Sequence, residues 1–506
     1  MASGGRKEFL TGYVIVGICQ LAFFLRPLVF IPIISRALGQ EAYGVYGQVV
    51  TTSLFLGPLL CLRLFVALTR YLAGSTSDRD ISRSYLFGTV IVGIASVGVL
   101  AVSEIWPGLF AQVIFGNWDL TQYVRPAMLY GCATALTTIL TSYYYTMRRQ
   151  LAYSIRQVAG IVGDCILIYF LSGHYAIGPC ITALAAWQMV VALFILGEII
   201  ARHGWARPSV AGFPGLWQFT SWMVVQHCIF FLASSGSRYV VAPKLGLGIS
   251  AVYGVTSQVA GIIGLVSAPN HIVLMPMLSA HWNANRPDLA RPILRVAYLL
   301  AILFGAVGLG AIMQLGTPLI LALSNKSFLA SPMLLLLMGV GVLIQGVQVI
   351  SALSYTMTRK VVMYQFIGLL GAVLNVGLSF VLIPSLGLVG AGIAFLAAFL
   401  FPQALIYMNS VRVFGVGLDW VRSAKSAVLG VIVYFALWPV NWLPVGNIAK
   451  VGIGIGLMVP VAGLGFFALR IYRLGELKAL VAQARGGRAG RAGVPGADAD
   501  PLDSGG

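Results

Sequence analysis

The sequence contains few charged residues for its length. They make up 9% of the 506-residue chain, whereas about a quarter is usual in a soluble protein. Hydrophobic residues make up 59%, and apolar stretches of roughly 20 residues recur along the whole chain. This composition excludes a soluble globular protein and predicts an all-α polytopic membrane protein.

Acidic residues are especially scarce. The chain has 14 Asp and Glu against 32 Lys and Arg, which gives a formal net charge of +18. Nucleic-acid-binding proteins share such an excess, but their basic residues form a patch on a folded domain. Here they occur singly or in pairs between hydrophobic segments. We interpret them as signals that orient membrane helices, and we expect no nucleic-acid partner.

Disulfide pairs and catalytic motifs are missing as well. All six cysteines fall inside predicted membrane spans, so no disulfide framework is expected. We find no metal-ligand spacing, no phosphate-binding glycine loop and no nucleophile elbow. We therefore expect a transporter with no metal and no cofactor. A membrane polysaccharide polymerase or glycosyltransferase is the rival from another class, disfavoured because the predicted outer loops are short.

About 14 membrane spans are predicted. Arg6 and Lys7 precede the first span and place the N-terminus in the cytoplasm by the positive-inside rule. With both termini inside, most of the 32 Lys and Arg residues fall in cytoplasmic segments, as expected for a multi-pass protein of the bacterial inner membrane. The predicted spans are 10–34, 46–69, 84–104, 124–146, 151–172, 176–200, 216–240, 249–279, 293–314, 331–355, 361–384, 388–410, 423–440 and 449–470.

Short motifs recur about 210 residues apart in the same order. Duplicated sets of membrane helices are common in secondary transporters, whose halves move about a shared site. Six helices per repeat should leave both halves in the same orientation, related by an axis along the membrane normal. The matches are Leu38-Gly39 with Leu245-Gly246, Val45-Tyr46-Gly47 with Val252-Tyr253-Gly254, Tyr145-Thr146-Met147 with Tyr355-Thr356-Met357, Gln157 with Gln365, and Gly178 with Gly390.

We expect the chain to be divided into five parts. Two six-helix lobes are joined by a cytoplasmic linker and followed by two additional helices and a cytoplasmic, largely disordered tail. The expected bounds are 1–200, 201–215, 216–410, 411–472 and 473–506, in that order.

Several segments resemble a known transporter family. They are FIPIISRALGQEAYGVYG (30–47), Ala67-Leu68-Thr69-Arg70-Tyr71-Leu72-Ala73, Leu274-x-Pro276-x-Leu278-Ser279 and Leu382-Ile383-Pro384-Ser385-Leu386-Gly387. Together they resemble the oligosaccharide (O-antigen and exopolysaccharide) flippases of the multidrug/oligosaccharidyl-lipid/polysaccharide exporter superfamily, over roughly residues 8–472. One departure is Arg238, where such flippases often carry an aspartate nearby.

The resemblance implies two six-helix lobes around a cavity that opens alternately to each side of the membrane. It implies translocation of undecaprenyl-pyrophosphate-linked oligosaccharide units for exopolysaccharide or lipopolysaccharide synthesis. We expect a monomer in contact with membrane lipid, partnered by polysaccharide polymerase and chain-length proteins, and coupled to H⁺ or Na⁺. The alternatives are a flippase of the lipid-linked peptidoglycan precursor and a multidrug or cation antiporter of the same superfamily.

Three arginines fall inside predicted spans: Arg26, Arg63 and Arg238. An arginine at mid-membrane costs about 2.5–3.5 kcal/mol on insertion scales, so it needs a wet cavity, an anion or a counter-charge. Arginine presents a fixed fork to phosphate oxygens. Because the resembled fold lines its cavity with these spans, we expect all three to bind the substrate, with Arg26 as the central contact. The alternative is that they snorkel to the membrane surface or bond free carbonyls.

Asp164 is the sole carboxylate well inside a predicted span, and its counterpart in the second repeat is Ala372. A charge in one half only favours an ion-coupling role. The alternative is a structural partner for an intramembrane arginine. Trp187 and Trp222 lie deep in their spans and are candidates for stacking on sugars, with core packing as the alternative.

Overall fold

The computed structural model describes residues 25–72, 77–147, 149–209, 213, 215–266, 274–275, 278–279, 282, 287–358 and 360–471. Across these ranges the chain forms α-helices and short 3-10 helices, and no strand. Eleven of the helices are long and apolar enough to cross a membrane, or up to 12 if a bent pair counts as one span. The predicted all-α polytopic fold is confirmed. Arg6, Lys7 and the predicted tail (473–506) lie outside the described residues.

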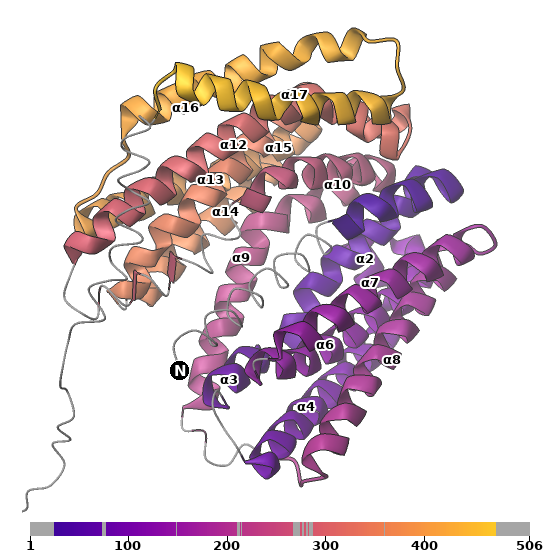
Figure 1. Ribbon diagram of the computed structural model, residues 1–506. Coiled ribbons are helices and arrows are strands. Elements are labelled where there is room, and N and C mark those ends of the chain that lie inside the picture. Colours follow the sequence, from indigo (N-terminus) through magenta and orange to yellow (C-terminus); the bar gives the residue numbers. More distant parts are fainter. Residues whose placement is uncertain are drawn as a thin grey trace, which may run out of the picture.

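The first helices of the chain pack around α6 (Figure 1). Residues 25–37 are helical, and α6 contacts α2, α4 and α8, with Tyr143 and Tyr144 fully buried near its end. The helices that follow are α2 (Gly39–Leu60), α3 (Leu64–Tyr71), α4 (Asp78–Ile105), α5 (Pro107–Phe115), α6 (Val124–Thr146), α7 (Gln150–Ser172) and α8 (Ile177–His203).

A second group of helices follows. α15 packs against both α13 and α14, and α14 runs along α9. This group is built from α9 (Leu216–Leu245), α10 (Leu247–Gly261), α12 (Pro287–Leu323), α13 (Pro332–Met357), α14 (Val361–Leu386) and α15 (Leu388–Phe414).

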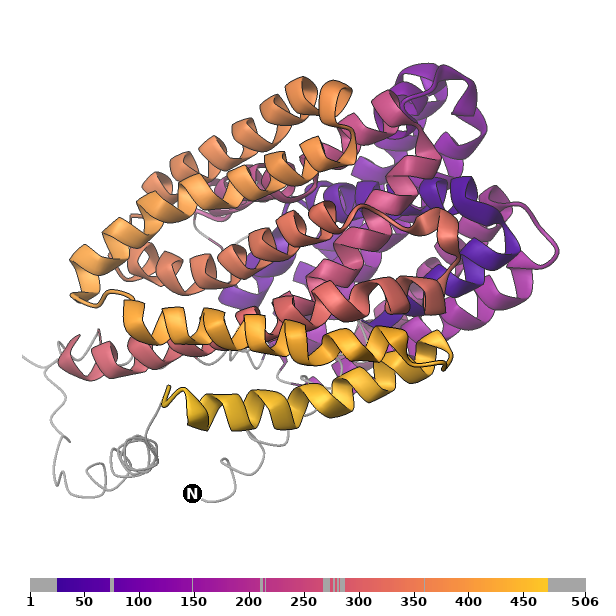
Figure 2. The same ribbon diagram turned by 90° about the horizontal axis from the view of Figure 1, so that it is seen from above.

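Two last helices, α16 (Trp420–Leu437) and α17 (Asn447–Ala468), lie on the outside of the second group (Figure 2). Both pack against α12. Short 3-10 helices complete the described elements: η1 (Trp118–Tyr123), η2 (Ile262–Val266), η3 (Lys326–Phe328) and η4 (Trp438–Trp442). The lobe boundaries and the repeat axis remain predictions.

The two groups meet where α2 packs on α10. α2 begins at Gly39, and its repeat mate Gly246 directly precedes α10. Both glycines have positive φ, +87° and +88°. Close packing then depends on Gly44, because a Cβ there would overlap the Leu247 carbonyl. The Gln40 side chain donates a hydrogen bond to the Gly248 carbonyl at 2.8 Å. These contacts join the two groups near the N-terminal ends of α2 and α10.

Candidate functional site

The membrane span predicted over 46–69 is not one continuous helix. It breaks between α2 and α3, whose axes differ by 48°. Leu62 and Arg63 at the break have φ of 48° and 55°, a left-handed conformation that costs residues with a Cβ about 1–2 kcal/mol each. The sequence gives no glycine there, which is why a single span was expected. Interrupted helices in membrane proteins occur where the main chain lines a cavity or is covered by protein.

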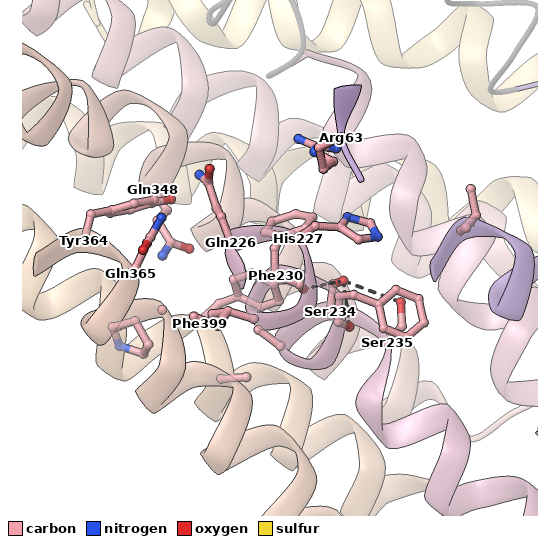
Figure 3. Close-up of a pocket in the computed structure, with 17 residues that line it drawn as sticks. Arg63, Gln226, His227, Phe230, Ser234, Ser235, Gln348, Tyr364, Gln365 and Phe399 are labelled. Atoms are coloured by element: carbon pink, nitrogen blue, oxygen red, sulfur yellow. Dashed lines mark hydrogen bonds between the residues drawn. The ribbon is translucent and has the colours of Figure 1, made fainter. Parts of the chain in front are cut away.

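Arg63 extends from this break into a cavity of about 470 Å³ (Figure 3). Leu54 and Arg63 contribute from the first group of helices, and α9, α13, α14 and α15 supply the remaining wall. Its polar lining residues are Arg63, Gln226, His227, Ser234, Ser235, Gln348, Tyr364 and Gln365. Arg63 is the one charged residue among the lining residues of this cavity, all of which are described.

The Arg63 guanidinium has no carboxylate partner in the part of the chain that the structure describes. Its carbon lies 5.0 Å from the centroid of the Phe65 ring, and its Nε is buried without a hydrogen-bond partner. On the same side of the cavity, a ring nitrogen of His227 lies 3.2 Å from the Phe55 carbonyl and connects α9 with α2. The cavity therefore combines an uncompensated cation with neutral polar groups.

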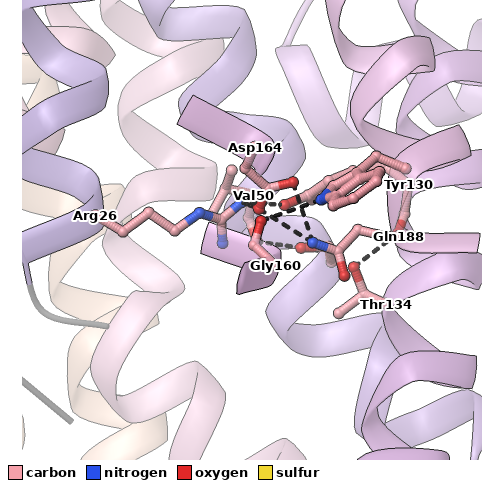
Figure 4. Close-up of polar contacts among 9 residues, drawn as sticks. Arg26, Val50, Tyr130, Thr134, Gly160, Asp164 and Gln188 are labelled. Carbon is pink, nitrogen blue, oxygen red and sulfur yellow. Dashed lines mark hydrogen bonds and ion pairs between the residues drawn. The ribbon is translucent and has the colours of Figure 1, made fainter. Parts of the chain in front are cut away.

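Arg26 and Asp164 meet in a buried ion pair within the first group (Figure 4). Nη2 of Arg26 lies 2.8 Å from Oδ2 of Asp164 and donates to the Tyr130 hydroxyl at 2.8 Å. The Gln188 amide donates to both Asp164 oxygens, at 3.2 and 3.0 Å. Asp164 is only 1% exposed. Asp164 thus balances the charge of Arg26, as its alternative interpretation as a structural partner requires. The ion-coupling role of Asp164 and the substrate-binding role of Arg26 remain predictions.

Arg238 lies on α9 between α2 and α10, away from the cavity lining. Its guanidinium is wedged between two repeat-related glycines, Gly47 and Gly254, and a Cβ on either one would overlap Nη2. The Nε atom is buried without a partner. No carboxylate pairs with Arg238 among the described residues. The three intramembrane arginines are therefore placed in three different surroundings, and only Arg63 lines the cavity.

The two tryptophans named as candidates do not line this cavity either. Trp187 donates from Nε1 to the Gly160 carbonyl at 3.1 Å, and its ring lies against Gly163, so it packs between α7 and α8. Trp222 is 44% exposed on α9, one helical turn before Gln226. Their predicted sugar contacts stay untested.

Sequence reasoning missed most of the cavity. It used Gln365 only as a marker of the repeat. A usable signal was present on α9, where Gln226, His227, Ser234 and Ser235 interrupt an apolar span. Gln348 on α13 and the adjacent Tyr364 and Gln365 on α14 were not recognised as cavity residues.

Comparison with known proteins shows the fold. No family model and no curated protein matches the chain. Among solved structures, "Lipid II flippase MurJ, inward closed conformation" matches with a TM-score of 0.72 at 14% identity, over 91% of this chain and 99% of that one. An inward-facing multidrug resistance MATE family transporter of the MOP superfamily matches with a TM-score of 0.61 at 12% identity, over 79% and 98%. The MATE multidrug transporter DinF-BH in complex with R6G gives 0.53 at 15%, over 82% and 98%. The chain has the fold of these membrane transporters.

Proposed function

We propose that this protein translocates a polyprenyl-pyrophosphate-linked saccharide across the bacterial inner membrane by alternating access. The observation that carries the proposal is the charge of the cavity, whose one ionic lining residue is Arg63, which has no carboxylate partner among the described residues. A pyrophosphate would supply the anion that this guanidinium lacks, and the planar fork of arginine suits phosphate oxygens. The shared fold with a lipid II flippase and with multidrug transporters supports a transport role.

The same observation disfavours an organic-cation exporter. A cation bound inside the membrane needs a carboxylate to balance it, and the described residues that line the cavity include no Asp or Glu. The buried carboxylate of Asp164 is already paired with Arg26. We propose that this pair couples transport to H⁺ or Na⁺, since an ion that competes for Asp164 would release Arg26.

A lipid-linked peptidoglycan precursor is the second candidate substrate. The match to the lipid II flippase favours it, whereas the sequence motifs favour an oligosaccharide of a surface polysaccharide. Both lipids share the polyprenyl pyrophosphate, so Arg63 would serve either one.

Replacing Arg63 tests the proposal. Purified protein in liposomes is supplied with undecaprenyl-pyrophosphoryl disaccharide that carries a fluorophore on the sugar, and dithionite then quenches the probe left outside. We expect Arg63→Gln to abolish protection of the probe and Arg63→Lys to retain part of it, because lysine keeps the charge but lacks the fork. Arg125→Gln is the matched control, because Arg125 is 75% exposed in its pair with Glu104. Wild-type rates from Arg63→Gln would overturn the proposal.

A further inference from the structure

The wall of the cavity contributed by the second group consists of neutral polar and aromatic side chains. Gln226 from α9, Gln348 from α13, and Tyr364 and Gln365 from α14 line it together (Figure 3). We call these three glutamines and the tyrosine beside Gln365 the amide wall. All four come from the second group, whereas Arg63 comes from the first.

Gln365 is the strongest indication that a ligand belongs there. The residue is buried, at 5% exposure, yet its Oε1 has no hydrogen-bond partner among the described residues. Its Nε2 reaches only the Trp222 carbonyl, at 3.5 Å, which is at the long limit of a hydrogen bond. A buried polar atom without a partner costs about 1–3 kcal/mol. A ligand hydroxyl in the cavity would remove that cost.

The other members of the amide wall are available as well. Gln226, Gln348 and Tyr364 are half-buried, and none of them forms a side-chain hydrogen bond to another described residue. An amide offers both a donor and an acceptor, which is the combination that a sugar hydroxyl requires. The rings of Phe230 and Phe399 line the same cavity and supply apolar faces for the carbon side of a sugar ring.

The internal repeat sets two charged positions of the first half against neutral positions of the second half. By the offsets of the repeat, Tyr364 corresponds to Arg156, and Ala372 corresponds to Asp164. In the first half both positions are charged and engaged, since Arg156 pairs with Glu198 and Asp164 pairs with Arg26. The second half has a neutral residue at both positions, and of the two Tyr364 lines the cavity.

We propose that the amide wall is a saccharide-binding subsite, in which Gln365 and its neighbours hydrogen-bond the first sugars of the substrate while Arg63 holds the pyrophosphate. This inference rests on the proposed function and assigns the sugars to the second group of helices and the pyrophosphate to the first. The cavity volume of about 470 Å³ lies within the roughly 300–1,000 Å³ of ligand-binding pockets. Acyl chains would need no amides, and organic cations would need carboxylates, so a neutral polyhydroxylated group fits best.

Two probes separate the subsite from the pyrophosphate contact. Binding of undecaprenyl pyrophosphate and of undecaprenyl-pyrophosphoryl disaccharide is measured on purified protein in nanodiscs. We expect wild-type protein to bind the disaccharide-bearing lipid more tightly than the bare lipid. Gln365→Leu and Gln348→Leu should each weaken binding of the disaccharide-bearing lipid roughly tenfold, as loss of one hydrogen bond to a desolvated partner does. Binding of the bare lipid should stay the same.

Internal controls come from the first half and from the core. Gln157 is the repeat mate of Gln365, and its side chain donates to the Tyr153 hydroxyl. Gln157→Leu should leave the affinity for both lipids unchanged. Gln403→Leu removes another amide with an unpaired Oε1 that does not line the cavity, and it should also be silent. Thermal unfolding of each variant confirms that it is folded.

The outcomes are distinguishable. An undiminished preference for the disaccharide-bearing lipid in both amide-wall variants would overturn the subsite and leave the proposed function standing. Equal weakening of both lipids would also overturn it, because the amides would then act on the lipid or on the fold. If wild-type protein binds neither lipid, the proposed function itself fails and the subsite with it.

Discussion

At the residue scale, Arg26 and Asp164 form a buried pair of opposite charges. Asp164 is almost fully enclosed and Arg26 is 17% exposed, and removing one partner of a buried pair leaves the other uncompensated, at a cost of about 3–5 kcal/mol. We therefore expect Asp164→Asn to lower the thermal unfolding midpoint of the purified protein markedly. The double variant Arg26→Gln, Asp164→Asn should recover most of that loss.

Transport assays distinguish an ion-coupling role of this pair from a structural role. If the pair couples ion movement to transport, the double variant is folded but no longer responds to an imposed H⁺ or Na⁺ gradient. A double variant with wild-type gradient dependence would reduce the pair to a structural role. An Asp164→Asn protein that unfolds at the wild-type temperature would contradict the ion pair itself.

The sequence identified these two residues separately but could not join them. Each stands out because a charge within an apolar span is expensive. Their pairing depends on the rotation of four helices, since Arg26, Tyr130, Asp164 and Gln188 each come from a different one. Hydrophobic periodicity does not fix that rotation in a protein whose lipid-facing surface is as apolar as its core.

At the element scale, α2 and α10 are in direct contact near their N-terminal ends. A methyl group at Gly44 on α2 would overlap the Leu247 carbonyl on α10, so Gly44→Ala should push the two helices apart. We expect this variant to lengthen the distance between spin labels at the exposed residues Glu41 and Ile249, measured by continuous-wave electron paramagnetic resonance. Gly98→Ala is the control, because a Cβ at that glycine meets no atom within 4 Å. An unchanged distance in Gly44→Ala would show that the α2–α10 contact does not depend on this glycine.

Elements were predicted from the sequence with uneven success. Helices such as α8 and α15 were placed within a few residues, because long apolar runs between polar loops define them. The break between α2 and α3 was missed, because neither Leu62 nor Arg63 is a residue that favours positive φ. The turn is closed by a local hydrogen bond instead, in which the Arg63 amide donates to the Pro58 carbonyl at 3.0 Å.

At the scale of the whole molecule, the two groups of helices are in close contact at the α2–α10 end and leave a cavity beside Arg63. The repeat-related glycines at this contact were visible in the sequence. The cavity was not, because its lining is drawn from five separate places along the chain and only one of those residues is charged. An account based on alternating access predicts that this contact opens when the substrate leaves on that side.

The selectivity of transport tests the central claim most directly. Proteoliposomes containing the wild-type protein are given either undecaprenyl-pyrophosphoryl disaccharide or the organic cation rhodamine 6G, under the same imposed ion gradients. We predict translocation of the anionic lipid-linked saccharide and no accumulation of the cation. Among the residues that the structure describes, the cavity lining contains an arginine without a carboxylate partner and no Asp or Glu. Accumulation of rhodamine 6G without movement of the lipid-linked saccharide would contradict the account.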